Sequence, residues 1–277
     1  MKAQEMKTST NIILAAIIAF VVTLYSHELT HLLLGLVFGT KIVSFCSWAV
    51  TMVTIEVEWQ RAIVQGSAAI VNIIMGFFAA AKFWKTKNGM TRAFLYYLAA
   101  FSWLVGFGYL LSDPILASSD RNGDWAKVIN LLGGSWGVRL PILLVGLAGY
   151  TYTIYWLAKA TQAFKTSDPE TLVGRTIKLL IVPYFVVNIL FTLLSFWHPV
   201  PELRLMVAIK SCWLGNFGFF AAAVGTYFQY KSTNVLFLDN FVEIPRKLSV
   251  NMLVIALLVY ATAAYFAVPR ILNVEVW

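Results

Sequence analysis

The sequence predicts an all-α polytopic membrane protein with about seven transmembrane helices and a short β-hairpin after the first helix. Hydrophobic residues make up 60% of the 277 residues and charged residues only 12%, and the mean hydropathy is +0.75. The apolar residues form runs of about twenty or more, which is enough for a helix to cross a bilayer. These runs cover residues 11–38, 61–84, 90–112, 136–163, 175–198, 204–230 and 248–269.

The charged residues are placed as in a membrane protein. The net charge is +8, and the 21 Lys and Arg residues lie mostly between the apolar runs, where cations flank membrane helices. This placement argues against nucleic-acid binding, and we expect a multi-pass integral protein whose partner is the lipid bilayer. Cys46 and Cys212 form no Cys-x-x-Cys pair and are expected to be packing residues.

The first run carries the motif His27-Glu28-Leu29-Thr30-His31. In a helix, His27 and His31 lie on one face, so both imidazoles can bind the same metal ion, with Glu28 beside them as the candidate general base. Ionisable side chains inside a membrane helix are costly unless they pair or bind something. The motif favours a single Zn²⁺ ion, with a buried polar network between helices as the alternative.

The segment 41–59 is predicted to form strands. It is rich in β-branched residues, and Thr54, Glu56 and Glu58 alternate with apolar residues. Such a hairpin could lie against the membrane site and present an edge to an extended peptide, or it could be an ordinary hairpin outside the membrane. The sequence leaves both arrangements open.

The run 61–84 contains a patch of small residues that begins at Gly66 and is followed by Asn72. Small residues let helices approach closely in lipid, and a polar amide in this setting favours a hydrogen bond between helices.

A catalytic zinc usually has three protein ligands, so the two histidines leave one ligand to find. The best candidates are Asp113, Asp120 and Asp124, which follow the run 90–112 on the side of the membrane where the first helix ends. Asp113 could instead terminate its helix before Pro114, and Asp120 or Asp124 could cap the next one.

The later part of the chain offers few polar groups for a site. Lys210 is expected to snorkel from the start of its helix, and His198 to lie at a membrane interface rather than on a metal. We therefore divide the chain into a core of three membrane helices plus hairpin, 1–135, and a four-helix membrane region of unknown role, 136–277.

Three segments, HELTH at 27–31, GSAAIVN at 66–72 and NGDW at 122–125, together resemble the site-2 protease family of intramembrane zinc metalloproteases. In that family a membrane helix carries His-Glu-x-x-His, a hairpin or loop and an asparagine-containing helix follow, and a later helix supplies an aspartate. The resemblance implies a role for each motif residue: His27, His31 and Asp124 as zinc ligands, Glu28 as the base and Asn72 as a substrate-binding residue. Asp113 is the second choice for the third ligand.

The resemblance implies an enzyme that cuts a peptide bond in a membrane-spanning protein or peptide. Two other classes remain as alternatives: a non-enzymatic transporter or receptor with a structural or degenerate metal site, and a metal-dependent hydrolase of a lipid or another non-peptide bond. Retention of metal with loss of cleavage in Glu28→Gln distinguishes the protease from a transporter.

Overall fold

The structure, a computed structural model, is helical along most of its length. It describes residues 2–47, 49–53, 55–116, 123–165, 172–198, 204, 205, 207–232, 242–245, 247–268 and 270–274. Thr54 and Asp120, which entered the predictions above, lie outside the described residues.

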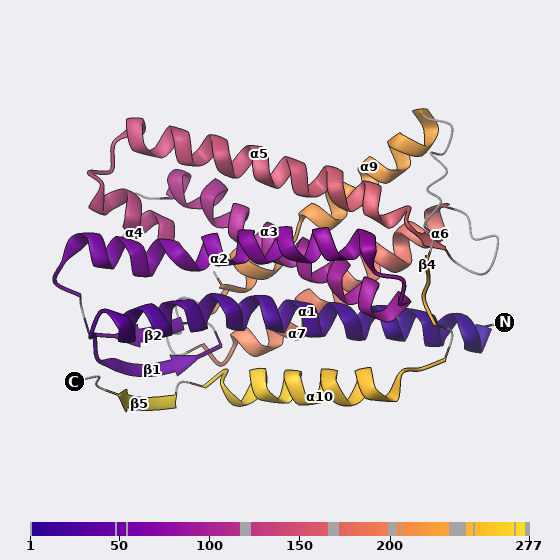
Figure 1. The fold of residues 1–277 in the computed structure, drawn as a ribbon, viewed down its shortest axis with the longest axis horizontal. Helices are drawn as coiled ribbons and strands as arrows, with labels where there is room; N and C mark the ends of the chain where they lie inside the picture. Colours follow the sequence, from indigo (N-terminus) through magenta and orange to yellow (C-terminus); the bar gives the residue numbers. More distant parts are fainter. Residues whose placement is uncertain are drawn as a thin grey trace.

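Within these residues, five helical segments are long and apolar enough to cross a membrane. They lie side by side along the long axis of the molecule (Figure 1), and they indicate a membrane protein, as predicted. Four are single helices: α1 (Lys2–Val37), α2 (Glu58–Lys85), α3 (Gly89–Leu116) and α5 (Trp136–Thr161). The fifth consists of α6 (Leu172–Thr176), the π-helical η1 (Ile177–Ile181) and α7 (Val182–Ser195).

The last two predicted runs do not each form one long helix, so seven spans are not confirmed. The run 204–230 is divided into the π-helical η2 (Ala208–Leu214) and α9 (Gly218–Ser232). Asn216 lies in the turn between them, where its amide donates to Oδ1 of Asn188 at 2.9 Å instead of facing lipid. The last run contains α10 (Val250–Tyr265), which is apolar but has only 16 residues.

The predicted hairpin is present and is part of a larger sheet. β1 (Ile42–Cys46) pairs antiparallel with β2 (Ala49–Met52) on one side and with β5 (Arg270–Val274) on the other. The strand order is β2-β1-β5, so β1 is central. A small parallel sheet of β3 (Phe164–Lys165) and β4 (Val242–Glu243) was not predicted.

The strand prediction was wrong for the second half of the segment 41–59. Glu56 lies in a bend, and Glu58 begins α2, three residues earlier than expected. A negative side chain in the first turn of a helix is favoured by the helix dipole. Arg61 adds a local hydrogen bond, in which its side chain donates to the carbonyl of Ile55 at 3.0 Å. These local contacts explain why the alternating pattern did not give a strand.

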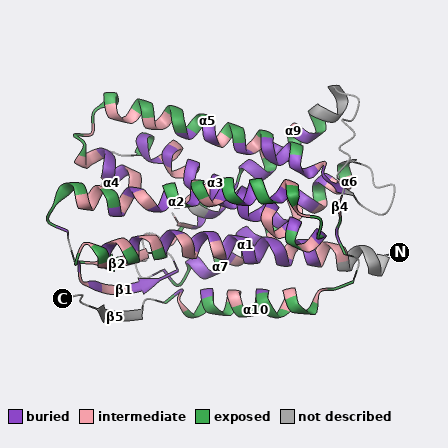
Figure 2. Cartoon of the chain, in the orientation of Figure 1, coloured by how far each residue is buried: buried purple, intermediate pink, exposed green. Residues whose placement is uncertain are grey.

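The core lies around α1 and α3, and exposed residues gather on the outer faces of α5 and α10 (Figure 2). Helices α2 and α3 approach closely at Gly76 of α2, where a β-carbon would lie 2.5 Å from the Trp103 ring of α3. The two predicted parts of the chain share this core. Phe20 packs edge-on against Phe191 with ring centroids 4.5 Å apart, and Phe101 meets Phe219 at 5.0 Å.

Candidate metal centre

The two motif histidines lie one turn apart on α1 and are both buried. Their Nε2 atoms are 3.3 Å apart, and the ring centroids are 5.0 Å apart. The helix periodicity therefore places the two imidazoles on one face, as predicted.

Asp124 is the first residue of α4 (Asp124–Leu131), and it reaches both histidines. Its Oδ2 atom lies 3.0 Å from Nε2 of His27 and 3.2 Å from Nε2 of His31. One ligand atom from each of the three residues lies within 4.8 Å of the others, a spacing that could hold a metal ion. The structure thus brings together the three residues that the motifs suggested as ligands.

Asp113, the second choice for the third ligand, is absent from this group. It is fully buried near the end of α3, and its carboxylate is used elsewhere. Oδ2 accepts the backbone N–H groups of Trp125 at 3.0 Å and Ala126 at 3.4 Å, while Oδ1 accepts from Nζ of Lys210 at 2.6 Å. Lys210 therefore does not snorkel as predicted, because it is paired inside the protein.

The hydrogen bonds of His31 fix its tautomer. Nδ1 lies 2.8 Å from the carbonyl oxygen of Val64, which can only accept, so Nδ1 carries the proton. In neutral His31, the lone pair of Nε2 then faces Nε2 of His27 and Oδ2 of Asp124. The lone pairs of these atoms repel one another unless a cation lies between them or His31 carries a second proton. The arrangement is that of a ligand held by a backbone carbonyl behind it.

Asn72 of α2 lies behind His27 in the same way. Its Nδ2 atom is 3.3 Å from Nδ1 of His27, while its Oδ1 atom is buried without a hydrogen-bond partner. Turning the amide by half a turn would exchange these atoms, so that Oδ1 accepts the N–H of Nδ1. Nε2 of His27 would then keep its lone pair for a metal ion. The unpaired oxygen therefore fits a metal-binding His27.

Glu28 is buried beside the cluster, where it interacts electrostatically with His27, His31 and Asp124. A carboxylate in this place can exchange a proton with a group at the centre.

Asp124 has a carboxyl group that is readily ionised. Burial raises its pKa, but the charge on His31 and the hydrogen bonds from His27 and His31 outweigh burial and hold the pKa well below its usual range. Nζ of Lys127 lies 3.9 Å from Oδ1 of the same carboxylate and 3.0 Å from Oε1 of Gln65. The carboxylate is thus the natural anionic ligand of the centre.

Sequence reasoning did not place Tyr109, Lys210 and Lys127 near the centre. The Tyr109 ring stacks on His27 with centroids 5.0 Å apart and an interplanar angle of 16°. His198 is buried just beyond the end of α7, and it is not part of the group formed by His27, His31 and Asp124. Both cysteines are buried, which agrees with the predicted packing role.

Comparison of the chain with protein-family models, with curated proteins and with solved structures finds no match in any of the three. The resemblance to the site-2 protease family therefore depends on the sequence motifs alone.

Proposed function

We propose that this chain is an intramembrane zinc metalloendopeptidase, which hydrolyses a peptide bond in a membrane-spanning substrate. The observation that carries the proposal is the convergence of Asp124 with His27 and His31, which lie 97 and 93 residues away in the sequence. Glu28, the acid that the motif requires, is buried beside them.

The spacing of the ligand atoms is compatible with zinc. With bonds of about 2.0–2.1 Å in a tetrahedron, two ligand atoms of zinc lie roughly 3.3 Å apart. The three distances between Nε2 of His27, Nε2 of His31 and Oδ2 of Asp124 are 3.0, 3.2 and 3.3 Å. Two imidazoles and one carboxylate also form a usual ligand set for a catalytic zinc that keeps a fourth position for water.

Each residue has a distinct part in the reaction. When bound, zinc supplies an activated water and polarises the peptide carbonyl. His27 and His31 would hold the ion through Nε2, and Asp124 would hold it through Oδ2. The Glu28 carboxylate accepts a proton from the attacking water and passes it to the nitrogen of the leaving amine.

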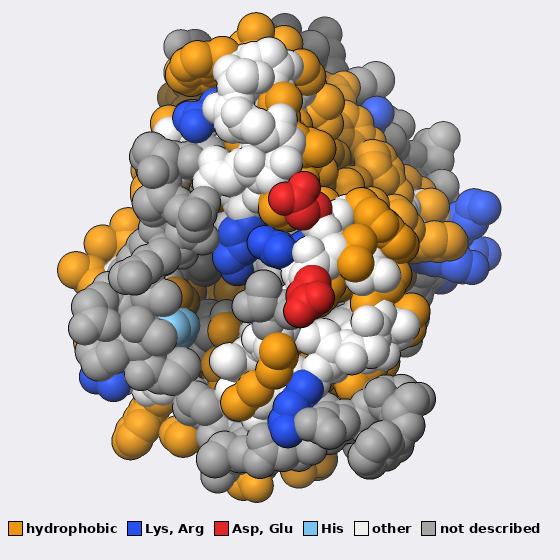
Figure 3. All heavy atoms as spheres, turned by 90° about the vertical axis from the view of Figure 1, so that its left-hand side faces the viewer, with side chains coloured by type: hydrophobic (Ala, Val, Ile, Leu, Met, Phe, Trp, Pro, Cys, Tyr) orange, Lys and Arg blue, Asp and Glu red, His pale blue; other side chains and the backbone are white. Residues whose placement is uncertain are grey.

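Hydrolysis requires that water reach the centre from outside the bilayer. The side chain of Asp124 is 15% exposed and that of its neighbour Lys127 is 42% exposed, so the centre lies just below the surface. Figure 3 views this end of the molecule, where side chains of Lys or Arg and of Asp or Glu lie beside a largely hydrophobic flank. A polar surface next to the ligands is what a hydrolase in a membrane needs.

The hairpin runs back along the part of α1 that carries the motif (Figure 1). The Tyr25 hydroxyl lies 3.1 Å from Oγ of Ser47 at the hairpin turn, and the side chain of Ile42 lies 3.1 Å from where a β-carbon on Gly35 would be. Among the described residues, β2 has a strand on one side only, whereas β5 covers the far edge of β1. A substrate segment in extended form can therefore add to β2 beside the metal centre.

The test is cleavage of membrane-spanning peptides by the full chain, loaded with zinc in detergent or vesicles. Wild type should release product, and Glu28→Gln should lose about 10²–10⁴-fold in rate while keeping its zinc. Glu58→Gln, which removes an exposed acid at the same end, is the matched control. If zinc-loaded wild type cleaves no more than Glu28→Gln across a library of such peptides, the protease assignment is wrong and a non-enzymatic metal site takes its place.

A further inference from the structure

One lysine from the C-terminal region contacts the part of the chain that carries the candidate metal ligands. Asp113 caps α4 from outside, because its Oδ2 atom accepts the N–H groups of Trp125 and Ala126 in the first turn of that helix. Gly123, which precedes α4, has φ +149° and makes no side-chain cap of its own. A β-carbon at Gly123 would collide with the Asp113 carboxylate. The position of Asp124 thus depends on Asp113.

Lys210 completes this arrangement from the other part of the chain. Its Nζ atom donates to Oδ1 of Asp113 at 2.6 Å, and Asp113 is fully buried. The same Nζ atom lies 5.4 Å from the ring centroid of Tyr109, which stacks on His27. One ammonium group therefore contacts the residue that supports Asp124 and the residue that supports His27.

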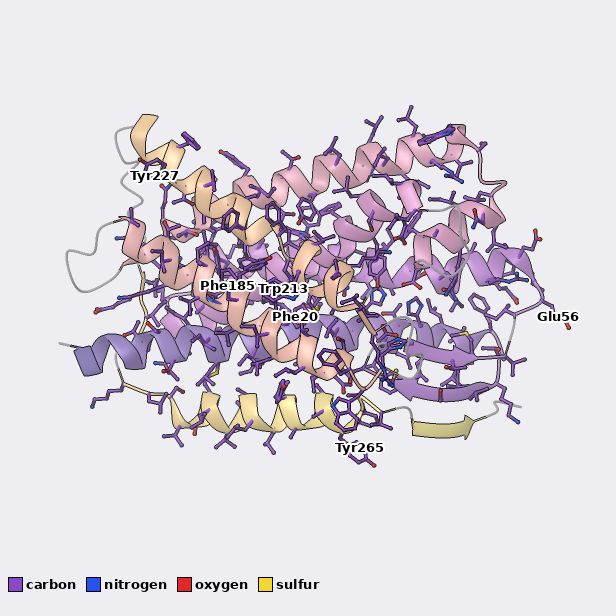
Figure 4. The ribbon with its side chains drawn as sticks, turned by 180° about the vertical axis from the view of Figure 1, so that it is seen from behind. Phe20, Glu56, Phe185, Trp213, Tyr227 and Tyr265 are labelled. Carbon is purple, nitrogen blue, oxygen red and sulfur yellow. The ribbon has the colours of Figure 1, made fainter. Side chains whose placement is uncertain are left out.

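The segment that carries Lys210 is itself anchored. Trp213, three residues later in η2, packs edge-on against Tyr184 with ring centroids 5.8 Å apart. It also contacts Phe185, with ring centroids 5.8 Å apart (Figure 4). Its indole N–H donates to Oγ1 of Thr192 at 3.0 Å. These contacts fix η2 on α7, so the lysine is presented from a rigid position.

We propose that Lys210, through Asp113, is a positioning residue that holds the start of α4 so that Asp124 meets the two histidines. The C-terminal region is then a structural part of the metal centre. This inference rests on the proposed function where it concerns metal affinity, but the hold on α4 exists without metal. Removing the lysine takes away the cation that pairs with the buried Asp113 carboxylate. The hydrogen bonds from the N–H groups of Trp125 and Ala126 to this carboxylate should then weaken.

Two measurements on the purified full chain test the inference. The first is hydrogen exchange of the peptide 123–131 in metal-free protein, and the second is zinc affinity by competition with a chelator. Lys210→Met should speed exchange in this peptide and weaken zinc binding about 10–100-fold. Lys210→Arg, which keeps a cation, should restore most of both. Lys178→Met, which removes a cation from η1 in the same region, should change neither.

The double variant Asp113→Asn/Lys210→Met adds a test of coupling. It removes both charges, so it should bind zinc more tightly than Lys210→Met alone. The inference is overturned if Lys210→Met exchanges and binds zinc like Lys178→Met. Failure of the proposed function gives other results. Wild type would then bind zinc without cleaving peptides, or it would bind no zinc while hydrogen exchange in the peptide 123–131 still responds to Lys210→Met.

Discussion

Oδ2 of Asp124 lies 3.0 Å from Nε2 of His27, so the first residue of a short helix after α3 meets the C-terminal half of the first membrane helix. His31 joins the same oxygen at 3.2 Å. This contact adds a third possible metal ligand to the two-histidine motif.

Removing a ligand should remove the metal. We expect about one zinc per chain in wild type by elemental analysis, and almost none in His31→Ala or Asp124→Ala. Asp113→Asn should still hold about one zinc at saturating concentration, because Asp113 supports the site without binding the ion. Equal zinc loss in Asp113→Asn and Asp124→Ala would contradict the assignment of Asp124 as the ligand.

Asn72 should act on zinc through His27. Asn72→Ala should weaken zinc affinity by roughly tenfold, because Nδ1 of His27 loses its acceptor. Asn72→Asp should keep the affinity, since a carboxylate also accepts that N–H. A substrate-binding role, which the family resemblance implies, gives the opposite pattern: cleavage falls in both variants while zinc affinity does not change. Measuring affinity and cleavage in the same samples separates the two roles.

The free edge of β2 should matter for substrate but not for zinc. The N–H of Val53 donates toward β1, to the carbonyl of Lys41 at 2.9 Å, so by alternation the N–H of Val50 points away from β1. Val50→Pro should raise KM several-fold with unchanged zinc content, because it removes a donor from the free edge only. Thr51→Pro, whose N–H faces β1, should disturb the hairpin itself. An unchanged KM in Val50→Pro would rule out strand addition at this edge.

Gly123→Ala should damage the centre through α4. Alanine is strained at φ +149° by roughly 1–3 kcal/mol, and its β-carbon would collide with Asp113. We expect lower thermal stability and weaker zinc binding. Gly133→Ala is the matched control, since Gly133 also has positive φ, +91°, but no atom lies within 4 Å of the added carbon. Gly133→Ala should lose stability without losing zinc affinity.

Local periodicity was enough to place much of this site. The spacing of His27 and His31 fixes their common face in any helix, and the apolar runs locate the first five spans because hydrophobic length is a local property. Asp124 came from a motif resemblance, and Asp113 could not be separated from it by sequence alone. The difference lies in whether the carboxylate meets two histidines or two backbone N–H groups, and this depends on tertiary packing.

The features that sequence reasoning missed are made by residues far apart in the chain. Lys210 and Asp113 are 97 residues apart, and β5 pairs with β1 from the other end of the sequence. A lone lysine at the start of an apolar run can either snorkel to the membrane interface or pair with a buried acid. The local sequence is the same in both cases, so it does not distinguish them. The break before α9 was missed because Gly215 and Asn216 were surrounded by apolar residues.

The start of α1 and the strand β5 lie at opposite ends of the bundle (Figure 1). In a bilayer these two points of the chain would face different aqueous compartments. A fluorescent or enzymatic reporter fused before α1 would thus sample the side away from the metal centre, and one fused after β5 would sample the near side. The second fusion would also emerge next to the central strand β1. Purification tags for cleavage assays therefore belong before α1.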